Sequence, residues 1–244
     1  MKKETRDAAI THAIASYPQE SCGLVIIRKG REVYYPCRNT AKTKQDHFVI
    51  STQDLIAAED MGEVIAIVHS HPDESSSPSD SDRVGCENSQ LPWYILSIGQ
   101  EDGKAPYFHS EHAISPCGYK APLVGRQFFH GVLDCYAIVR DFYKEEFGID
   151  LINFERTDEW WNRGENLYMK NIEAAGFVRV EVDELKYGDV IIMQIRADEP
   201  NHAGVYIGDG WFLHHFYGRL SSRDIYGGYW KEKTTSVVRH KDKL

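Results

Sequence analysis

The alternation of apolar and polar positions divides the first half of the chain into helical and extended segments. Residues 6–17 and Thr52–Met61 have helical character, whereas 22–27, 64–68 and 93–98 are short apolar runs of the kind that form buried strands. Helices and strands mixed in this way predict an α/β unit built around a sheet.

The second half has a different pattern. A helix is predicted from Cys135, because apolar side chains recur at the helical period and fall on one face: Ile138, Val139, Phe142, Tyr143 and Phe147. Two β-rich runs, 202–207 and 211–216, flank Gly-Asp-Gly and predict a hairpin. The stretch between the halves lacks periodicity and is rich in proline and glycine. We therefore predict two domains, 1–112 and 123–244, joined by a linker at 113–122.

Composition and charge narrow the function classes. The 244 residues carry a formal net charge of −9 and show no basic patch, which argues against a nucleic-acid binder. Neither an apolar stretch of about 18 residues nor a signal-peptide core is present, so we expect no membrane insertion and no secretory signal. The cysteines follow no metal or disulfide spacing and favour free thiols in a reducing compartment. They are Cys22, Cys37, Cys86, Cys117 and Cys135.

A candidate metal site begins where an apolar run enters the polar stretch "HSHPDESSSPSDSD". In an extended strand, residues i and i+2 share a face, so His69 and His71 would point in one direction. Two imidazoles on one strand face make half of a zinc site, and a carboxylate from the loop supplies a third ligand. The fourth position is then left for water, which needs a general base to take its proton. The alternative is a pair of ordinary surface histidines.

The wider spacing resembles the JAMM (MPN-type) zinc metalloprotease signature, a glutamate followed downstream by H-x-H-P-x6-S-x2-D. The resemblance covers about the first 110 residues and implies an α/β sandwich of the cytidine-deaminase-like type. It also implies roles for individual residues. These are His69, His71 and Asp82 as zinc ligands, Glu20 as general acid/base and Ser79 as oxyanion stabiliser. Asp80, and more weakly Asp73, remain alternatives to Asp82.

A candidate nucleophile lies at the start of the predicted helix in the second half. Asp134 is a good N-cap residue, which places Cys135 in the first helical turn. Unpaired backbone N–H groups and the helix dipole favour a thiolate there, so we expect a lowered thiol pKa. The alternative is a buried structural cysteine, the usual state of a free cysteine.

The predicted hairpin supplies histidine partners for this cysteine. If Gly-Asp-Gly forms a three-residue loop, Gly204 faces His214, and His202 lies diagonal to His214 on the same face. A two-residue loop would reverse the parity and select His215 instead. The sequence geometry alone leaves both histidines open.

The segments "GVLDCYAIVRDFY" and "NHAGVYIGDGWFLHHF" are similar to the NlpC/P60 family of papain-like cysteine peptidases, over roughly residues 120–235. The resemblance implies an α+β fold, a strand opened by Gly188-Asp189, and a triad of Cys135, His202 and His214. It thereby favours His214 over His215. Members of the family typically cleave the γ-D-glutamyl to diamino-acid bond in peptidoglycan stem peptides.

A JAMM half followed by an NlpC/P60 half resembles the bacteriophage lambda tail tip assembly protein K family. The resemblance implies a bifunctional hydrolase with Zn²⁺ as cofactor, and with stem peptides and other tail tip proteins as partners. It places the protein in the host cytoplasm during assembly, with delivery in a virion tail tip or an assembly intermediate. A structural assembly factor that uses both folds as binding modules is the alternative. A cellular deubiquitinase-like enzyme, suggested by the JAMM half alone, is disfavoured by the second half.

Overall fold

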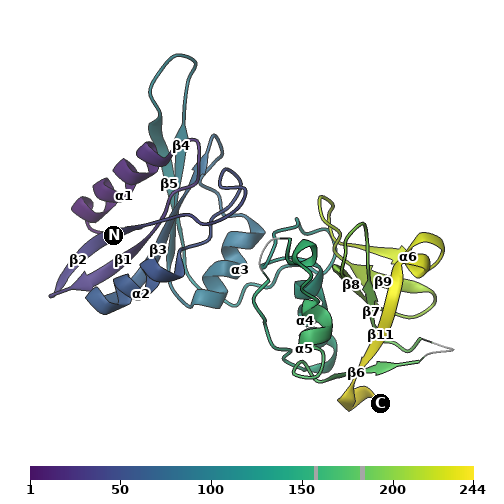
Figure 1. Ribbon diagram of the computed structural model, residues 1–244. Helices are drawn as coiled ribbons and strands as arrows, with labels where there is room; N and C mark the ends of the chain where they lie inside the picture. The colour runs from purple at the N-terminus through teal and green to yellow at the C-terminus, as the bar shows by residue number, and fades with distance from the viewer. Residues whose placement is uncertain (157–158, 182–184) are drawn as a thin grey trace. The chain divides into compact units, whose positions relative to one another are not determined.

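The computed structural model describes residues 1–156, 159–181 and 185–244. The chain forms two compact units, residues 1–120 and 121–244, and each is described by itself (Figure 1). The division of the sequence at a 113–122 linker stays a prediction.

The first unit is a mixed five-stranded sheet with helices on both faces. The strand order is β2-β1-β3-β4-β5, in which β3 and β4 are parallel and the other neighbours antiparallel. Its elements in chain order are α1 (Lys3–Ser16), β1 (Cys22–Arg28), β2 (Arg31–Cys37), α2 (Thr52–Met61), β3 (Glu63–Pro72), α3 (Asp80–Ser89), β4 (Trp93–Gly99) and β5 (Tyr107–Ile114).

Alternation along β1 divides the apolar side chains of this unit between two cores. Val25 packs with Ala9 of α1 on one face of the sheet. Leu24 packs on the other face with Ala58 of α2 and Cys86 of α3. A strand buried on both faces reads as a continuous apolar run, which is why the sequence shows one here.

Strand β3 continues past the apolar run to Pro72, so both histidines of the polar stretch lie within one strand, as predicted. One feature of this unit differs from the predicted pattern. The region around Asp82, predicted as loop, is the start of helix α3. The physical reason is a capping box: the Ser79 side chain accepts from the Asp82 backbone N–H, and the Asp82 side chain accepts from the Ser79 backbone N–H.

The second unit is a six-stranded sheet of order β10-β9-β8-β7-β11-β6 in which all neighbours are antiparallel. Its elements are α4 (Cys135–Phe147), η1 (Trp160–Arg163), α5 (Leu167–Asn171), β6 (Phe177–Val180), β7 (Val190–Met193), β8 (His202–Tyr206), β9 (Trp211–His214), β10 (Ser222–Ile225), α6 (Gly228–Lys233), β11 (Thr234–His240) and η2 (Lys241–Lys243).

Helix α4 covers one face of this sheet with the apolar stripe that its sequence predicts. Ile138 and Phe142 are buried against Ile192 of β7 and Val205 of β8. On the opposite face, Phe212 of β9 belongs to a smaller apolar cluster that includes Trp230 of α6 and Met193. The central strands are therefore buried on both sides.

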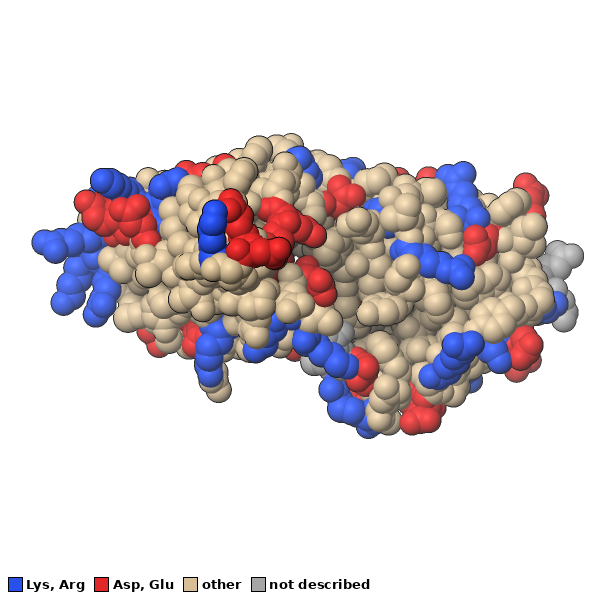
Figure 2. All heavy atoms as spheres, turned by 90° about the horizontal axis from the view of Figure 1, so that it is seen from above, with Lys and Arg blue, Asp and Glu red and all other residues tan. Residues whose placement is uncertain are grey.

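None of the helices in the described parts of the chain has the length and apolarity that crossing a membrane requires. On the face shown in Figure 2, acidic and basic side chains are interspersed, and each sign occurs in small groups. This distribution accords with the ordinary charged content of 27% and the modest negative net charge.

Candidate functional site

The first candidate site joins the end of β3 to the start of α3. His69 Nε2 and His71 Nε2 lie 3.1 Å apart, and Asp82 Oδ1 lies 3.1 Å from His69 Nε2. Asp82 Oδ2 lies 3.4 Å from His71 Nε2. Three potential ligand atoms thus converge within 4.8 Å of one another, and all three residues are buried.

Neighbouring groups hold the two imidazoles in place. His71 Nδ1 lies 2.8 Å from the carbonyl oxygen of Ser75, which can only accept, so Nδ1 carries a proton and Nε2 is the nitrogen that faces the other two side chains. The ring of Phe48 stacks on His69 with 4.7 Å between centroids. Two imidazole nitrogens and one carboxylate oxygen form a donor set that zinc accepts. The residues present therefore fit a bound metal ion.

The electrostatics of the cluster support the same conclusion. Burial disfavours a charged His71, but its hydrogen bonds to the Asp82 side chain and the Ser75 backbone, together with the charges of Asp82 and Glu20, outweigh burial and raise its pKa to about 9. Burial lowers the pKa of His69. Burial alone would raise the pKa of Asp82, yet the two histidines hold it well below its usual range. The pocket thus stabilises positive charge between these atoms, as a cation site does.

Glu20, the predicted general acid/base, lies just before β1 and is only 7% exposed. Its carboxyl group is close enough to His71 and Asp82 to interact electrostatically with both. Burial raises its pKa to about 8, while the charge of His71 opposes the shift. A carboxyl group with a pKa near neutrality can both take and give a proton.

Ser79, predicted to stabilise an oxyanion, is hydrogen-bonded to Asp82, the carboxylate of the site. Its hydroxyl donates to Asp82 Oδ2 at 2.8 Å, and its backbone N–H donates to the same oxygen at 2.7 Å. Of the alternative ligands, Asp80 accepts from Tyr119, and Asp73 accepts from Tyr17. Among the described residues, neither belongs to the metal-ligand group.

The second candidate site is centred on Cys135 at the start of α4. The Asp134 side chain caps the helix by accepting from two backbone N–H groups, and it also accepts from Arg156 Nε at 2.7 Å. Both charged side chains of this pair are almost fully buried. Because a buried, paired carboxylate is rigid, it fixes the first turn and the position of the cysteine.

The expected thiolate is wrong for this structure. Burial raises the pKa of Cys135 to about 11, the negative charge of Asp134 adds to the rise, and the hydrogen bond from Tyr168 only partly offsets it. Desolvation of the thiolate outweighs the helix N-terminus because the sulfur is enclosed. Cys135 is therefore a thiol at neutral pH.

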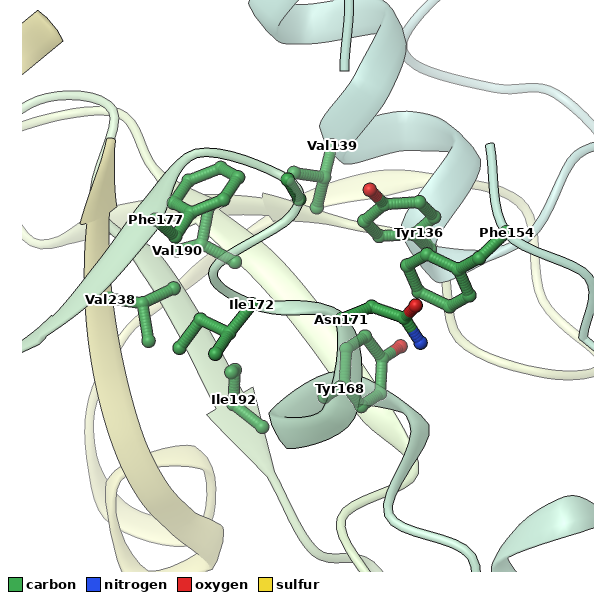
Figure 3. Close-up of a pocket in the computed structure, with 11 residues that line it drawn as sticks. Tyr136, Val139, Phe154, Tyr168, Asn171, Ile172, Phe177, Val190, Ile192 and Val238 are labelled. Carbon is green, nitrogen blue, oxygen red and sulfur yellow. The ribbon is translucent and has the colours of Figure 1, made fainter. Parts of the chain in front are cut away.

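The surroundings of the sulfur explain this enclosure. Cys135 Sγ lies 3.1 Å from Tyr168 Oη and 4.0 Å from the carbonyl oxygen of Asn201. Figure 3 shows that the ring of Tyr168 also helps to line an apolar pocket between α4, α5 and the sheet, with Tyr136 and Phe154 on the same side. The hydroxyl of Tyr168 thus contacts the sulfur while its ring lines this pocket.

The two predicted histidines are hydrogen-bonded to each other. The loop of the β8–β9 hairpin has three residues, and Gly204 pairs with His214, which selects His214 over His215. His202 Nε2 lies 3.0 Å from His214 Nδ1, and both rings are buried. A Cβ at Gly204 would come within 3.0 Å of His214 Cβ and clash with Phe212, so glycine leaves space for this diagonal contact.

His215 has the opposite parity and a different environment. Its ring packs edge-on against Phe128, and neither ring nitrogen has a hydrogen-bond partner in the described structure. The pKa of the His215 ring is lowered to about 4. Burial is the main cause, and the positive charge of Arg126 lowers the pKa further.

The structure adds side chains that sequence reasoning missed. His214 Nε2 lies 3.1 Å from Asp224 Oδ2, on the neighbouring strand β10. Two further side chains belong to the site: Tyr168, whose hydroxyl contacts Cys135 Sγ, and Arg156, which donates to Asp134. Period-2 alternation within "SRDI" would have put Ser222 and Asp224 on one face, but nothing in the sequence indicates that this face meets His214.

Comparison with known proteins accounts for both halves. A family of prokaryotic homologs of the JAB domain matches residues 2–108, and the NlpC/P60 family matches residues 125–239. Tail tip assembly protein K of Escherichia phage N15 is 40% identical over 244 residues, covering 99% of this chain and 96% of that protein. The chain belongs to the tail tip assembly protein K family. Membership confirms the predicted resemblance and the predicted order of two peptidase-family domains.

Other relatives cover the chain in part. Tail tip assembly protein K of Escherichia phage lambda is 38% identical over 192 residues, which are 79% of this chain and 89% of that protein. The crystal structure of the NlpC/p60 domain of peptidoglycan hydrolase SagA is 18% identical, with a TM-score of 0.33. It covers 48% of this chain and 89% of that chain. The two predicted fold classes, a mixed-sheet JAB-type domain and an antiparallel-sheet NlpC/P60 domain, are confirmed.

Proposed function

We propose that the second half is a cysteine endopeptidase that cleaves peptidoglycan stem peptides at the γ-D-glutamyl to diamino-acid bond. The observation that carries this proposal is the hydrogen-bonded pair of buried histidines on the adjacent strands β8 and β9. The thiol lies against the backbone that bears His202, since its sulfur interacts with the backbone of Asn201 and Ala203. The choice of bond is taken from the family.

The protonation states define the order of events. Because Cys135 is a thiol and burial lowers the pKa of His202 well below its usual range, no ion pair exists before substrate binds. Cys135 Sγ attacks the scissile carbonyl as His202 takes the thiol proton. The proton then passes to the leaving amine, which departs and leaves a thioester. Water hydrolyses this thioester, releases the acid and restores the thiol, while His214 orients His202 throughout.

For the first half, we infer a zinc-dependent peptidase or isopeptidase. His69, His71 and Asp82 would hold the ion, and zinc would supply a Lewis acid that polarises the scissile carbonyl. Glu20, whose burial places its pKa near 8, would exchange protons with water and the leaving group. Ser79 keeps its predicted role as oxyanion donor. In this structure its hydroxyl donates to Asp82, so the hydroxyl would have to turn toward the substrate to take that role.

The names of the relatives, tail tip assembly protein K, support a role in tail tip assembly. We infer that the protein works with other phage tail tip proteins in the host cytoplasm, and that its lytic half opens the cell wall during assembly or penetration. Delivery occurs in a virion tail tip or an assembly intermediate. Nucleic acid and membrane insertion have no part in this proposal.

Digestion of purified muropeptides tests the cysteine half. Wild type is expected to release stem-peptide fragments, Cys135→Ala to release none, and Glu20→Gln to release as much as wild type. Metal analysis of the purified chain tests the zinc half, with one zinc per chain expected in wild type and none in His69→Ala. Digestion that Cys135→Ala leaves unchanged would refute the cysteine assignment, and a wild type without metal would refute the zinc assignment.

The enclosure of Cys135 by Tyr168 favours a second candidate, a structural assembly factor that uses both folds as binding modules. A cysteine that is 9% exposed and kept as a thiol suits a packed interior as well as a resting enzyme. Phage complementation separates the two. Infectious tails from the Cys135→Ala and Glu20→Gln variants would show that catalysis is dispensable, whereas non-infectious tails would favour the enzyme.

A further inference from the structure

Three side chains from three neighbouring strands form a linear hydrogen-bonded series in the second unit. His202 lies on β8, His214 on β9 and Asp224 on β10. The series runs from His202 Nε2 to His214 Nδ1 at 3.0 Å, and from His214 Nε2 to Asp224 Oδ2 at 3.1 Å. Each contact joins diagonal neighbours, because the strand registers pair His214 with Gly204 and with Ser222.

The protons in this series follow from the chemistry of its members. Burial lowers the pKa of both histidines, so each ring is neutral near pH 7 and carries a single N–H. An ionised carboxylate can only accept a hydrogen bond. The proton of His214 must then lie on Nε2, facing Asp224. This leaves Nδ1 of His214 as an acceptor, which requires the proton of His202 to lie on Nε2.

We propose that Asp224 is a positioning residue of the cysteine site: through His214 it fixes the tautomer of His202 and leaves His202 Nδ1 unprotonated, as the base for Cys135. This inference rests on the proposed cysteine peptidase function. When His202 takes the thiol proton on Nδ1, its Nε2–H bond to His214 is unchanged. The carboxylate, one ring further away, then stabilises the new positive charge.

The surroundings of the series allow few other arrangements. The ring of His214 stacks on Phe212 at 4.3 Å between centroids and meets Trp230 edge-on at 4.6 Å, so it cannot turn freely. Ser222 Oγ donates to Asp224 Oδ1 at 3.3 Å and orients the carboxylate.

Other titratable groups also change the pKa values of the two rings. Arg219 lowers the pKa of His214, and His215 lowers that of His202, so both favour the neutral rings that the series requires. Asp224 acts in the opposite direction on His214, but burial prevails.

Substitution of Asp224 by asparagine tests the inference with little change of shape. An amide can donate to His214 Nε2, which permits the reversed series and places the proton of His202 on Nδ1. Long-range ¹H–¹⁵N spectra of the full chain report which nitrogen of each ring is protonated. We expect an unprotonated His202 Nδ1 in wild type and a protonated Nδ1 in a large fraction of Asp224→Asn.

Turnover of muropeptides should change in parallel. We expect kcat to fall at least about tenfold in Asp224→Asn with KM little changed, and Asp224→Glu to recover much of the loss. Asp242→Asn is the matched control, because Asp242 faces another histidine, His240, at 3.7 Å outside the series. That control is expected to leave both the spectra of His202 and the turnover unchanged.

The spectra decide the inference independently of activity. A wild type with the His202 proton on Nδ1 overturns it, and so do identical tautomers in wild type and Asp224→Asn. This wild-type measurement needs no variant and holds even if Asp224→Asn is unstable. A wild type that cleaves no muropeptide but shows the expected tautomers refutes the proposed function and leaves the hydrogen-bonded series intact.

Discussion

Each half of the molecule contains a group of two buried histidines and one aspartate, and the two groups are built differently. In the first half, both Nε2 atoms and the carboxylate of Asp82 converge on one point. In the second half, each ring uses its two nitrogens in opposite directions, and the contacts run in a line to Asp224. The same residue types thus form a group that could hold a metal ion in one domain and a line of hydrogen bonds in the other.

The placement of the histidines on their strands causes this difference. His69 and His71 are two positions apart on one strand, so their rings lie side by side, tilted by 59°, and their Nε2 atoms come within 3.1 Å of each other. His202 and His214 come from adjacent strands and meet diagonally. Converging lone pairs repel unless a cation or a proton lies between them, whereas a line of alternating donors and acceptors is stable without one.

Zinc content gives the largest expected contrast between the two groups. His71→Ala removes one of three ligands and is expected to weaken zinc binding by more than about a hundredfold. His214→Ala, which removes the corresponding ring from the line, is expected to leave one zinc per chain. Metal analysis after dialysis against a weak chelator measures both. Zinc loss in His214→Ala would contradict the contrast.

Alkylation of Cys135 tests whether the sulfur near the linear group is a neutral thiol at pH 7. The raised pKa of about 11 predicts that iodoacetamide modifies Cys135 at pH 7 more than about tenfold more slowly than an ordinary cysteine. Mass spectrometry in a Cys117→Ser background follows the reaction, because Cys117 is the exposed thiol of the chain.

Tyr168→Phe is expected to slow this alkylation further, since the lost hydroxyl stabilises the thiolate. Tyr136→Phe is the control, because its hydroxyl donates to the carbonyl oxygen of Ile152 and not to the sulfur. Rapid alkylation of wild type at pH 7 would show that the sulfur is a thiolate after all.

When metal is removed, the stability of the two units is expected to change with pH in opposite directions. Raised pKa values, about 8 for Glu20 and about 9 for His71, mean that the folded first unit binds more protons than the unfolded chain. Its stability is full in mild acid and is lost as pH rises toward 9. Burial lowers the pKa values of His202 and His214, so the second unit loses stability as pH falls below about 6.5.

Hydrogen exchange followed by mass spectrometry measures the two units in one sample, through peptides from β3 and β8 and after correction for intrinsic rates. In the presence of EDTA, we expect protection of β3 to decrease and that of β8 to increase between pH 5 and pH 8. Changes of the same sign in both peptides would refute the contrast.

The hydroxyl groups that orient the two carboxylates give the smallest expected difference. Ser79→Ala removes a capping box and is expected to destabilise the first unit by about 1 kcal/mol and to weaken zinc binding. Ser222→Ala removes one long contact to a partly exposed carboxylate and is expected to have an effect of a few tenths of a kcal/mol. Thermal unfolding of both variants measures the difference, and equal losses would contradict it.

Local spacing predicted the first group better than the second. The interval between His69 and His71 is set within one strand, and the capping pattern from Ser79 to Asp82 lies within one helix start, so their geometry is local. The sequence could not show that α3 begins there, because the serine-rich and aspartate-rich composition is equally typical of a loop. Three of its residues nevertheless converge as the spacing indicates.

The sequence by itself determined two domains of peptidase-family type, the histidine pairs, and a cysteine at a helix start. Only the tertiary structure decided the hairpin register that selects His214, the contact with Asp224, and the enclosure that keeps Cys135 a thiol. The physical reason is that these depend on strands that are neighbours in the sheet and on burial by Tyr168, which is distant in sequence. Periodicity along a chain reports which face a side chain occupies, and only packing decides what that face meets.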